Sequence, residues 1–145
     1  MNIVTRLAGT EIIIIDGAMG TELQRRGVPL NREIWSAAAL LSHPHLVREI
    51  HVDYIRAGAE IQIAATYNTT PHVINPSNFD TTSRELAATA LRLVREGIDV
   101  AEPAHPVWIA GSISTTVESR RKEMLDISML RDSFTEHAET LAEQG

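Results

Sequence analysis

Glu11-Ile12-Ile13-Ile14-Ile15-Asp16-Gly17 is the stretch that decides the fold class. Its uninterrupted row of isoleucines predicts a β-strand, because β-branched side chains favour extended backbone. Continuous rather than alternating apolar character indicates a strand covered on both faces, as in a parallel sheet. The run stops at a carboxylate and a glycine, where the strand would pass into a loop. We therefore expect an α/β protein whose first strand spans residues 11–16.

Two further apolar runs end in the same way. Ile61-Gln62-Ile63-Ala64-Ala65 leads into Thr66-Tyr67, and Val107-Trp108-Ile109-Ala110 leads into Gly111-Ser112. We expect both runs to be strands. They lie too far apart in the sequence to be hairpin partners, so the segments between them must be crossovers that connect parallel strands.

The first crossover has helical periodicity and recognisable ends. Pro44 suits the first turn of a helix, because its missing N–H would have no partner there, and Gly58 is placed to end that helix. Apolar residues fall on one face between them, at Leu46, Val47, Ile50 and Tyr54. A shorter helical turn is expected over residues 21–26, after the first strand.

The two later segments are also helical. Thr82 and Glu85 have the spacing of a capping box, in which each side chain satisfies a backbone N–H at the start of a helix. We expect that helix to close at Gly97. A last helix starts near Asp126, and its expected core-facing stripe consists of Ile127, Leu130, Phe134, Ala138 and Leu141.

Strands and helices therefore alternate in the order β-α-β-α-β-α. This order predicts a parallel sheet with right-handed crossovers, although it does not separate a doubly wound fold from a (β/α)8 barrel. The chain has 145 residues, which by length alone allows one domain with its own core.

Composition excludes several classes of protein. The sequence has no cysteine, so it contains no disulfide, no thiolate nucleophile and no zinc site built on sulfur. Its net charge of −6 argues against a nucleic-acid-binding protein, which usually carries a basic patch. No apolar run approaches the roughly 18 residues that cross a bilayer, and residues 1–10 lack the pattern of a secretory signal. We expect a cytoplasmic protein with neither a membrane nor a nucleic acid as partner.

The ends of the three expected strands carry small or polar residues, over residues 16–21, 66–69 and 111–114. In parallel α/β proteins, ligands bind at the carboxyl ends of the strands, where the loops converge. Three such ends together favour a binding face at this edge of the sheet.

Asp16 is the most informative residue of this face. Its carboxylate could hold a substrate ammonium or act as an acid or base, and it could equally cap the short helix that follows. Gly17 and Gly20 allow close approach to the backbone, whose N–H groups could receive a carboxylate or phosphate. The spacing of a dinucleotide fingerprint or a P-loop is absent, which disfavours a nucleotide.

A metal site is not expected at His43, His45, His51 and Asp53, although they are close in the sequence. Their offsets do not match the i, i+4 pair that presents two ligands from one helical face. We expect His43 and His45 to flank the start of a helix, and His51 to lie on its partly exposed side.

Several ordered motifs resemble the homocysteine S-methyltransferase family. The resemblance continues in register over nearly the whole chain. It is carried by Asp16-Gly17-Ala18-Met19-Gly20-Thr21-Glu22-Leu23, Gly27, Trp35-Ser36, Pro44, His51, Tyr54, Ala57-Gly58-Ala59, Thr66-Tyr67 and Ala110-Gly111-Ser112-Ile113.

The resemblance implies a fold and an activity. The family fold is a (β/α)8 (TIM) barrel, so residues 1–145 would be the N-terminal portion of a homocysteine-binding barrel domain, about three βα units that end before the fourth strand. The family reaction transfers a methyl group to the thiol of homocysteine and gives methionine. The expected partners are therefore homocysteine and a methyl donor, whose identity the sequence leaves open.

The resemblance also implies substrate-binding residues, which are Asp16, Gly17, Ala18, Thr66, Tyr67 and Asn68. The aspartate matches the family residue near the homocysteine amino group, and the backbone of the next two residues matches the family stretch that faces the homocysteine carboxylate. The other three match a loop that borders the thiol and the methyl donor. No catalytic residue and no metal ligand is assigned in this chain.

The family's zinc-binding cysteines belong to later strands, and this sequence has none. Zinc is therefore a cofactor of the full-length family and not of this chain. Our preferred interpretation is a truncated methyltransferase that is inactive alone, and we expect the isolated chain to self-associate or to be poorly soluble. The alternatives are a half-barrel that needs a complementary chain or copies of itself, and a small non-catalytic α/β module that binds an amino-acid-like ligand.

Overall fold

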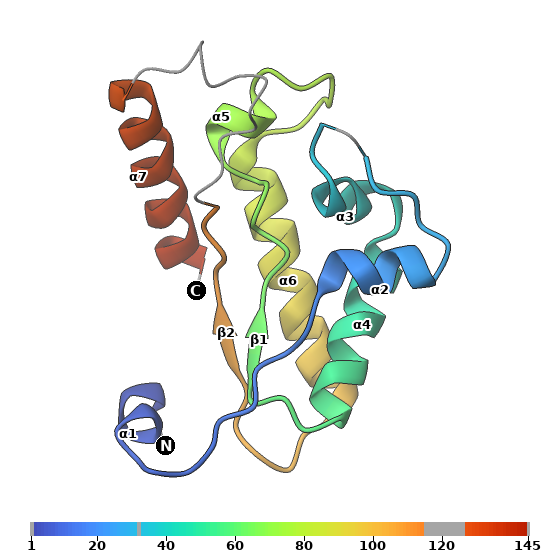
Figure 1. Cartoon of the computed structure of the whole chain (residues 1–145), viewed down its shortest axis with the longest axis vertical. Coiled ribbons are helices and arrows are strands. Elements are labelled where there is room, and N and C mark those ends of the chain that lie inside the picture. Colours follow the sequence, from blue (N-terminus) through green and yellow to red (C-terminus); the bar gives the residue numbers. More distant parts are fainter. Residues whose placement is uncertain (1, 32, 115–126, 145) are drawn as a thin grey trace.

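The computed structural model describes residues 2–31, 33–114 and 127–144. Helices dominate this part of the chain, around a short parallel sheet (Figure 1). In chain order the elements are α1 (Ile3–Leu7), α2 (Met19–Arg25), a 3-10 turn η1 (Ser36–Ala38), α3 (Ala39–Ser42), α4 (Pro44–Arg56), β1 (Ile61–Ile63), α5 (Pro71–Ile74), α6 (Ser83–Ala101), β2 (Trp108–Ala110) and α7 (Ile127–Gln144). None of the helices in the described ranges is long and apolar enough to span a membrane.

The sheet has the parallel arrangement that the sequence predicts. β1 and β2 pair in parallel with Gln62 opposite Ile109. Ile15 adds a parallel bridge to Ile61 on the other side of β1. The segment around Ile15 therefore runs beside β1, which lies between it and β2. The α/β class and the parallel pairing are confirmed.

The first strand is much shorter than the predicted 11–16, and the expectation that it is covered on both faces is wrong. Its only bridge in the described residues is at Ile15. Ile12 is 86% exposed, and Ile14 and Ile15 are both more than half exposed. A row of isoleucines becomes a buried strand only where other elements cover it, and the described elements leave these side chains open to solvent.

The starts of the two long crossover helices are confirmed. Pro44 is the first residue of α4. Ahead of α6, Glu85 Oε2 accepts the Thr82 N–H at 2.8 Å and Thr82 Oγ1 accepts the Glu85 N–H at 3.2 Å, which completes the capping box. The end at Gly97 is wrong, because α6 continues to Ala101 and stops at Glu102, which has a left-handed φ of 48°.

Gly97 has a packing role instead. A Cβ built on it would lie 3.1 Å from the Cβ of His51 in α4. The absence of a side chain therefore lets α6 approach α4 closely at this point. The helices α4 and α6 lie side by side (Figure 1), and this close contact buries the face of α4 that carries His51.

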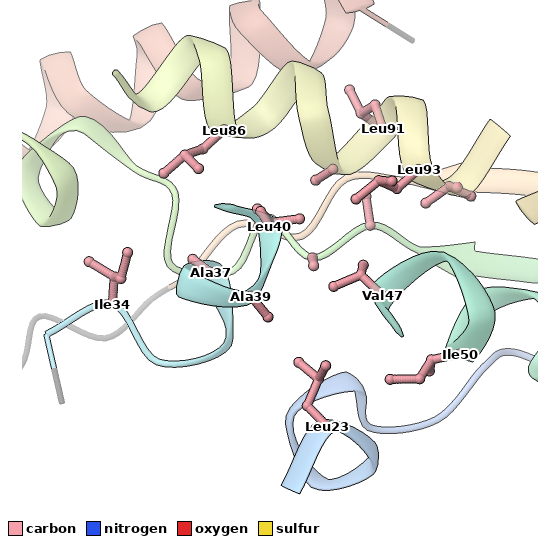
Figure 2. Close-up of a cluster of buried hydrophobic side chains, with 14 of the residues drawn as sticks. Leu23, Ile34, Ala37, Ala39, Leu40, Val47, Ile50, Leu86, Leu91 and Leu93 are labelled. Atoms are coloured by element: carbon pink, nitrogen blue, oxygen red, sulfur yellow. The ribbon is translucent and has the colours of Figure 1, made fainter. Parts of the chain in front are cut away.

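The apolar core lies between α6 and the N-terminal half of the chain. Figure 2 shows Leu93 of α6 directed toward the region of Val47 and Ile50 of α4, with Leu23 of α2 at the far side, while Leu91 is buried on another face of α6. Each of these five side chains is 2% exposed or less. The core therefore fixes α2, α4 and α6 relative to one another, and with them the loops at the end of the sheet.

The predicted core-facing stripe of α7 is only partly correct, because Leu141 packs against the core but two of its other members are exposed. Ile127 is 77% exposed, and Ala138 is also exposed. The buried residues of α7 are Ser133, His137 and Thr140. They share one face of the helix, which packs against α5, α6 and the loops after the strands, where polar partners are available. The start near Asp126 lies outside the described residues.

Candidate functional site

The strand ends converge at one edge of the sheet. Asp16 follows the bridge at Ile15, the loop that begins at Ala64 follows β1, and Gly111 follows β2. Hydrogen bonds join these ends: the Ile63 N–H donates to the Asp16 carboxylate, and Thr66 and Ser112 bond each other. The sequence prediction that the strand ends lie together is correct.

The Asp16 carboxylate ends the parallel ladder. Its Oδ2 accepts the backbone N–H of Ile63 at 2.9 Å, while the N–H of Asp16 bonds the Ile61 carbonyl at 3.0 Å. In a continued ladder, the Ile63 N–H would bond the backbone carbonyl of Asp16. The alternative that Asp16 caps the next helix is wrong, because the N-cap of α2 is Ala18 and no side chain caps that helix.

The side chain of Asp16 is buried, although Asp16 lies at the end of a strand. Its side chain is 2% exposed, and among the described residues Oδ1 has no hydrogen-bond partner. Burial raises the pKa of Asp16 to about 6, and the N–H groups of Ile63 and of Asp16 itself oppose this shift. The carboxylate is therefore ionised at neutral pH with one oxygen unsatisfied, an arrangement that suits a cationic ligand group.

Two further buried residues adjoin Asp16. His51 Nδ1 lies 2.9 Å from Gln62 Oε1 and 4.0 Å from Asp16 Oδ2. His51 and Gln62 are both 0% exposed. Burial lowers the pKa of His51, and its hydrogen bond to Gln62 opposes that shift. The imidazole is therefore neutral, and the expectation that it is partly exposed is wrong.

Sequence reasoning did not assign His51 and Gln62 to the site, although a signal was present. His51 is four residues after Val47 and three before Tyr54, so it lies within the predicted apolar face of the helix. Gln62 interrupts an apolar strand at a position that faces this helix. A buried amide and a buried imidazole on facing elements are expected to bond each other.

Gly17 and Ala18 are both exposed in the loop after Asp16. A Cβ on Gly17 would lie 2.7 Å from the Tyr54 hydroxyl and 2.9 Å from ring carbon Cε1. Glycine is therefore required for Tyr54 to pack against this loop. Burial, followed by the negative charges of Glu22 and Asp16, raises the pKa of the Tyr54 phenol.

Thr66 connects the ends of β1 and β2. Its hydroxyl donates to the Ser112 carbonyl at 2.9 Å and accepts the Ser112 N–H at 2.8 Å. Thr66 is 0% exposed, so it shapes the site without facing solvent. Of the other two predicted residues in this loop, Tyr67 is 45% exposed and Asn68 is partly buried. The contacts described for the Asp16 carboxylate are instead with the Ile63 N–H and, at 4.0 Å, with His51.

His137 of α7 packs behind the Thr66 loop. It is 0% exposed, and neither ring nitrogen has a hydrogen-bond partner of good geometry among the described residues. Burial lowers the pKa of His137, and the carbonyls of Ser112 and Thr66 oppose the shift. This helix was predicted to present an apolar face, and the sequence analysis therefore missed His137.

The residues of this chain do not fit a zinc site built on thiolates. The sequence has no cysteine. The described residues contain no group of three or more His, Asp or Glu side chains placed to hold a metal ion. Of the histidines and the aspartate clustered between residues 43 and 53, His51 is buried against Gln62 and Asp53 forms an ion pair with Arg26 at 2.6 Å.

Comparison with known proteins gives a consistent set of relatives. A family model for homocysteine S-methyltransferase matches residues 13–145. Homocysteine S-methyltransferase 2 of Zea mays is 37% identical over 113 residues, which cover 71% of this chain and 33% of that protein. Homocysteine S-methyltransferase of Escherichia coli K12 is 37% identical over 100 residues, which cover 69% of this chain and 30% of that protein. The chain thus spans about a third of these relatives.

Solved structures agree with the sequence matches. The metallated form of the homocysteine methyltransferase MmuM from Escherichia coli superposes with a TM-score of 0.80 at 30% sequence identity, over 97% of this chain and 53% of that chain. The oxidized form gives a TM-score of 0.81 at 29% identity, over 100% of this chain and 54% of that chain. The backbone described here therefore corresponds to about half of that solved structure.

Proposed function

We propose a function for this chain from one premise: the chain belongs to the homocysteine S-methyltransferase family. This membership confirms the resemblance that its sequence motifs indicated. The strand ends around Asp16 bind the amino-acid part of homocysteine in a protein that methylates the homocysteine thiol and forms methionine. Residues 1–145 then supply the first βα units of a (β/α)8 barrel, as a partial homocysteine-binding domain.

The observation that carries this proposal is the state of the Asp16 carboxyl group. One oxygen is held by the Ile63 N–H, and the other is buried without a partner among the described residues. With its pKa raised to about 6, the group is ionised at neutral pH. A buried carboxylate oxygen without a partner is costly, and an ammonium group of a ligand would satisfy both its charge and its hydrogen bonding.

The other proposed contacts come from the neighbouring loops. The exposed backbone at Gly17 and Ala18 suits the carboxylate of an amino acid, whose oxygens accept N–H donors. Tyr67 and Asn68 lie on the loop after β1 and would border the thiol and the methyl donor. Thr66 would contribute by holding this loop to the end of β2, since its hydroxyl already bonds Ser112.

Activation of the thiol is not assigned to this chain. A zinc-bound thiolate would be a better nucleophile at neutral pH than a thiol, and the family ligands for that zinc are cysteines. None of the 145 residues is a cysteine. We therefore derive no step through zinc, and propose that thiol activation and methyl transfer need groups from outside this sequence, on the same polypeptide or on a complementing chain.

A second candidate function is binding without catalysis. An isolated α/β module with this strand-end site would hold an amino-acid-like ligand through the same Asp16 contact. The two candidates share the amino-acid site and differ in turnover. The chain by itself is expected to form no methionine under either candidate. Methionine formation from homocysteine, assayed with several methyl donors after addition of a chain that supplies the missing part of the barrel, separates them.

Binding tests the shared part of the proposal directly. Isothermal titration calorimetry with L-homocysteine at pH 7.5 should give saturable binding to the wild-type chain, and Asp16→Asn should abolish it. Asp99→Asn is the matched control, because it removes an exposed carboxylate from α6 and should bind as the wild type does. Equal binding by all three proteins, or binding by none, would refute the amino-acid site.

A further inference from the structure

We propose that His51 and Gln62 are positioning residues for Asp16, and that a neutral imidazole N–H, fixed by Gln62, orients the carboxylate without cancelling its charge. The proposal rests on the proposed function, since it assigns a purpose to the charge that Asp16 offers to a ligand ammonium. Neither residue is expected to touch the ligand.

The three side chains lie together because of the strand register. Ile15 and Ile61 are paired in parallel, so the residues that follow them, Asp16 and Gln62, point to the same side of the sheet. That side faces α4, where His51 meets both. All three side chains are 2% exposed or less, so they interact in a medium where a dipole acts more strongly than in water.

The hydrogen bonds fix which ring nitrogen carries the proton. Gln62 Oε1 is only an acceptor, and it lies 2.9 Å from His51 Nδ1, so Nδ1 carries the hydrogen and Nε2 is bare in the neutral ring. The same N–H is 4.0 Å from Asp16 Oδ2. At that distance it makes no hydrogen bond with Asp16, but its positive end still favours the ionised carboxylate.

A neutral donor suits this site better than a charged one. An arginine or lysine in the place of His51 would form an ion pair with Asp16 and compete with the ammonium of a ligand. Burial keeps His51 neutral by lowering its pKa, and Gly97 leaves the room that lets α6 enclose the ring. The negative charge of Asp16 is thereby oriented and remains available.

The cluster also retains unused hydrogen-bonding capacity. Asp16 Oδ1, His51 Nε2 and Gln62 Nε2 all lack partners among the described residues. The Nδ1–H of His51 has two acceptors nearby, Gln62 Oε1 at 2.9 Å and Asp16 Oδ2 at 4.0 Å. In this structure it donates to Gln62. Removing Gln62 should release this N–H to Asp16, whereas removing His51 should deprive Asp16 of it.

NMR of the Asp16 carboxyl carbon measures the Asp16 pKa and tests the proposal, because removing His51 and removing Gln62 should change that pKa in opposite directions. In His51→Leu, the carboxylate loses the N–H dipole, and the Asp16 pKa should rise by about half a unit to one unit. In Gln62→Met, the N–H turns to Oδ2, and the Asp16 pKa should fall by a similar amount, about half a unit to one unit. His51→Asn places an amide N–H where Nδ1 lies and should restore the wild-type titration.

His72→Leu is the matched control. His72 is another buried imidazole whose Nδ1 has one side-chain bond, at 2.8 Å to Ser133 Oγ, and no contact that the structure describes connects it to Asp16. It should lose stability as His51→Leu does and leave the Asp16 titration unchanged. If His51→Leu does not fold, Gln62→Met and His51→Asn still carry the test.

The outcomes separate this inference from the proposed function. Opposite shifts in the His51→Leu and Gln62→Met variants support positioning even if L-homocysteine fails to bind the wild type, a result that would refute the function alone. An unmoved Asp16 titration, or shifts in one direction that His72→Leu reproduces, would overturn the positioning role even if homocysteine binds.

Discussion

The Asp16 carboxylate lies 2.9 Å from the backbone nitrogen of Ile63 and takes the hydrogen bond that would otherwise extend the parallel ladder. This contact ends the first strand and at the same time buries the carboxyl group. The burial that would suit a ligand therefore lowers the stability of the unliganded protein, because a buried carboxylate without a full set of partners is poorly solvated.

Asp16→Asn should therefore stabilise the fold at neutral pH. With the pKa raised to about 6, the folded state binds this proton more tightly than the unfolded state does. The resulting penalty is absent below the unfolded pKa, grows between about pH 4 and pH 6, and stays constant above. Urea unfolding should give Asp16→Asn an advantage of about 3 kcal/mol at pH 7.5 and much less at pH 4.5. A less stable Asp16→Asn at pH 7.5 would contradict the raised pKa.

Gly17→Ala should destabilise the chain by about 1–3 kcal/mol, because the new methyl group overlaps the Tyr54 ring. Tyr54→Phe should not relieve the overlap, since ring carbon Cε1 would still lie 2.9 Å from the methyl position. Tyr54→Ala should relieve it. A double-mutant cycle by urea unfolding measures the coupling, and additive effects of Gly17→Ala and Tyr54→Ala would refute the contact.

Thr82→Ala should cost about 0.5–2 kcal/mol of stability, because it removes the side chain that caps α6. Thr81→Ala is its control. Thr81 is the preceding residue, and its hydroxyl donates to the Glu85 side chain at 3.3 Å without capping a backbone N–H among the described residues, so its loss should cost less. Thermal and urea unfolding compare the two, and equal losses would contradict the capping role.

The buried histidines should make the fold sensitive to acid. Burial lowers the pKa of His51, His72 and His137, so the unfolded state binds protons that the folded state rejects. Their contribution is fully present above the unfolded pKa of about 6.5 and is lost as the pH falls toward the lowered folded values. Asp16 has the opposite effect between about pH 6 and pH 4, where protonation of its carboxylate adds to the stability of the fold as the pH falls.

Asp16→Asn is therefore the background in which to measure the histidine effect. Its free energy of unfolding should fall between pH 7.5 and pH 5. Adding His137→Gln should reduce that slope, because one of the groups that distinguish the two states is gone. A slope that His137→Gln leaves unchanged would show that His137 does not contribute.

The parts of the fold that sequence predicted are those set by local chemistry. Pro44 begins α4 and Thr82 caps α6 because both effects act within one turn. The parallel pairing followed from the order of the runs. The exposure of Ile12 could not be predicted, because burial depends on which elements cover a strand.

The same distinction holds in the site. The sequence identified Asp16 from its place after an apolar run, but the capping and ligand-binding alternatives were separated only by the contact with Ile63. His51 was predicted to lie on the partly exposed side of its helix. The prediction failed because its burial depends on Gly97 of α6, a helix that is far away in the sequence but packs against α4. The buried polar face of α7 was not predicted, because apolar residues at neighbouring positions also recur with helical spacing and indicated a different buried face.

The central claim is that Asp16 holds the ammonium group of homocysteine, and NMR titration of the wild-type chain with L-homocysteine at pH 7.5 tests it most directly. The comparison ligand is 4-mercaptobutanoate, which keeps the thiol and the carboxylate and lacks the amino group. The account predicts saturable shifts of the Asp16 carboxyl carbon and of the Gly17 and Ala18 amides with homocysteine, and much weaker binding of the comparison ligand. Equal binding of both ligands, or an Asp16 signal that homocysteine leaves unmoved, would contradict it.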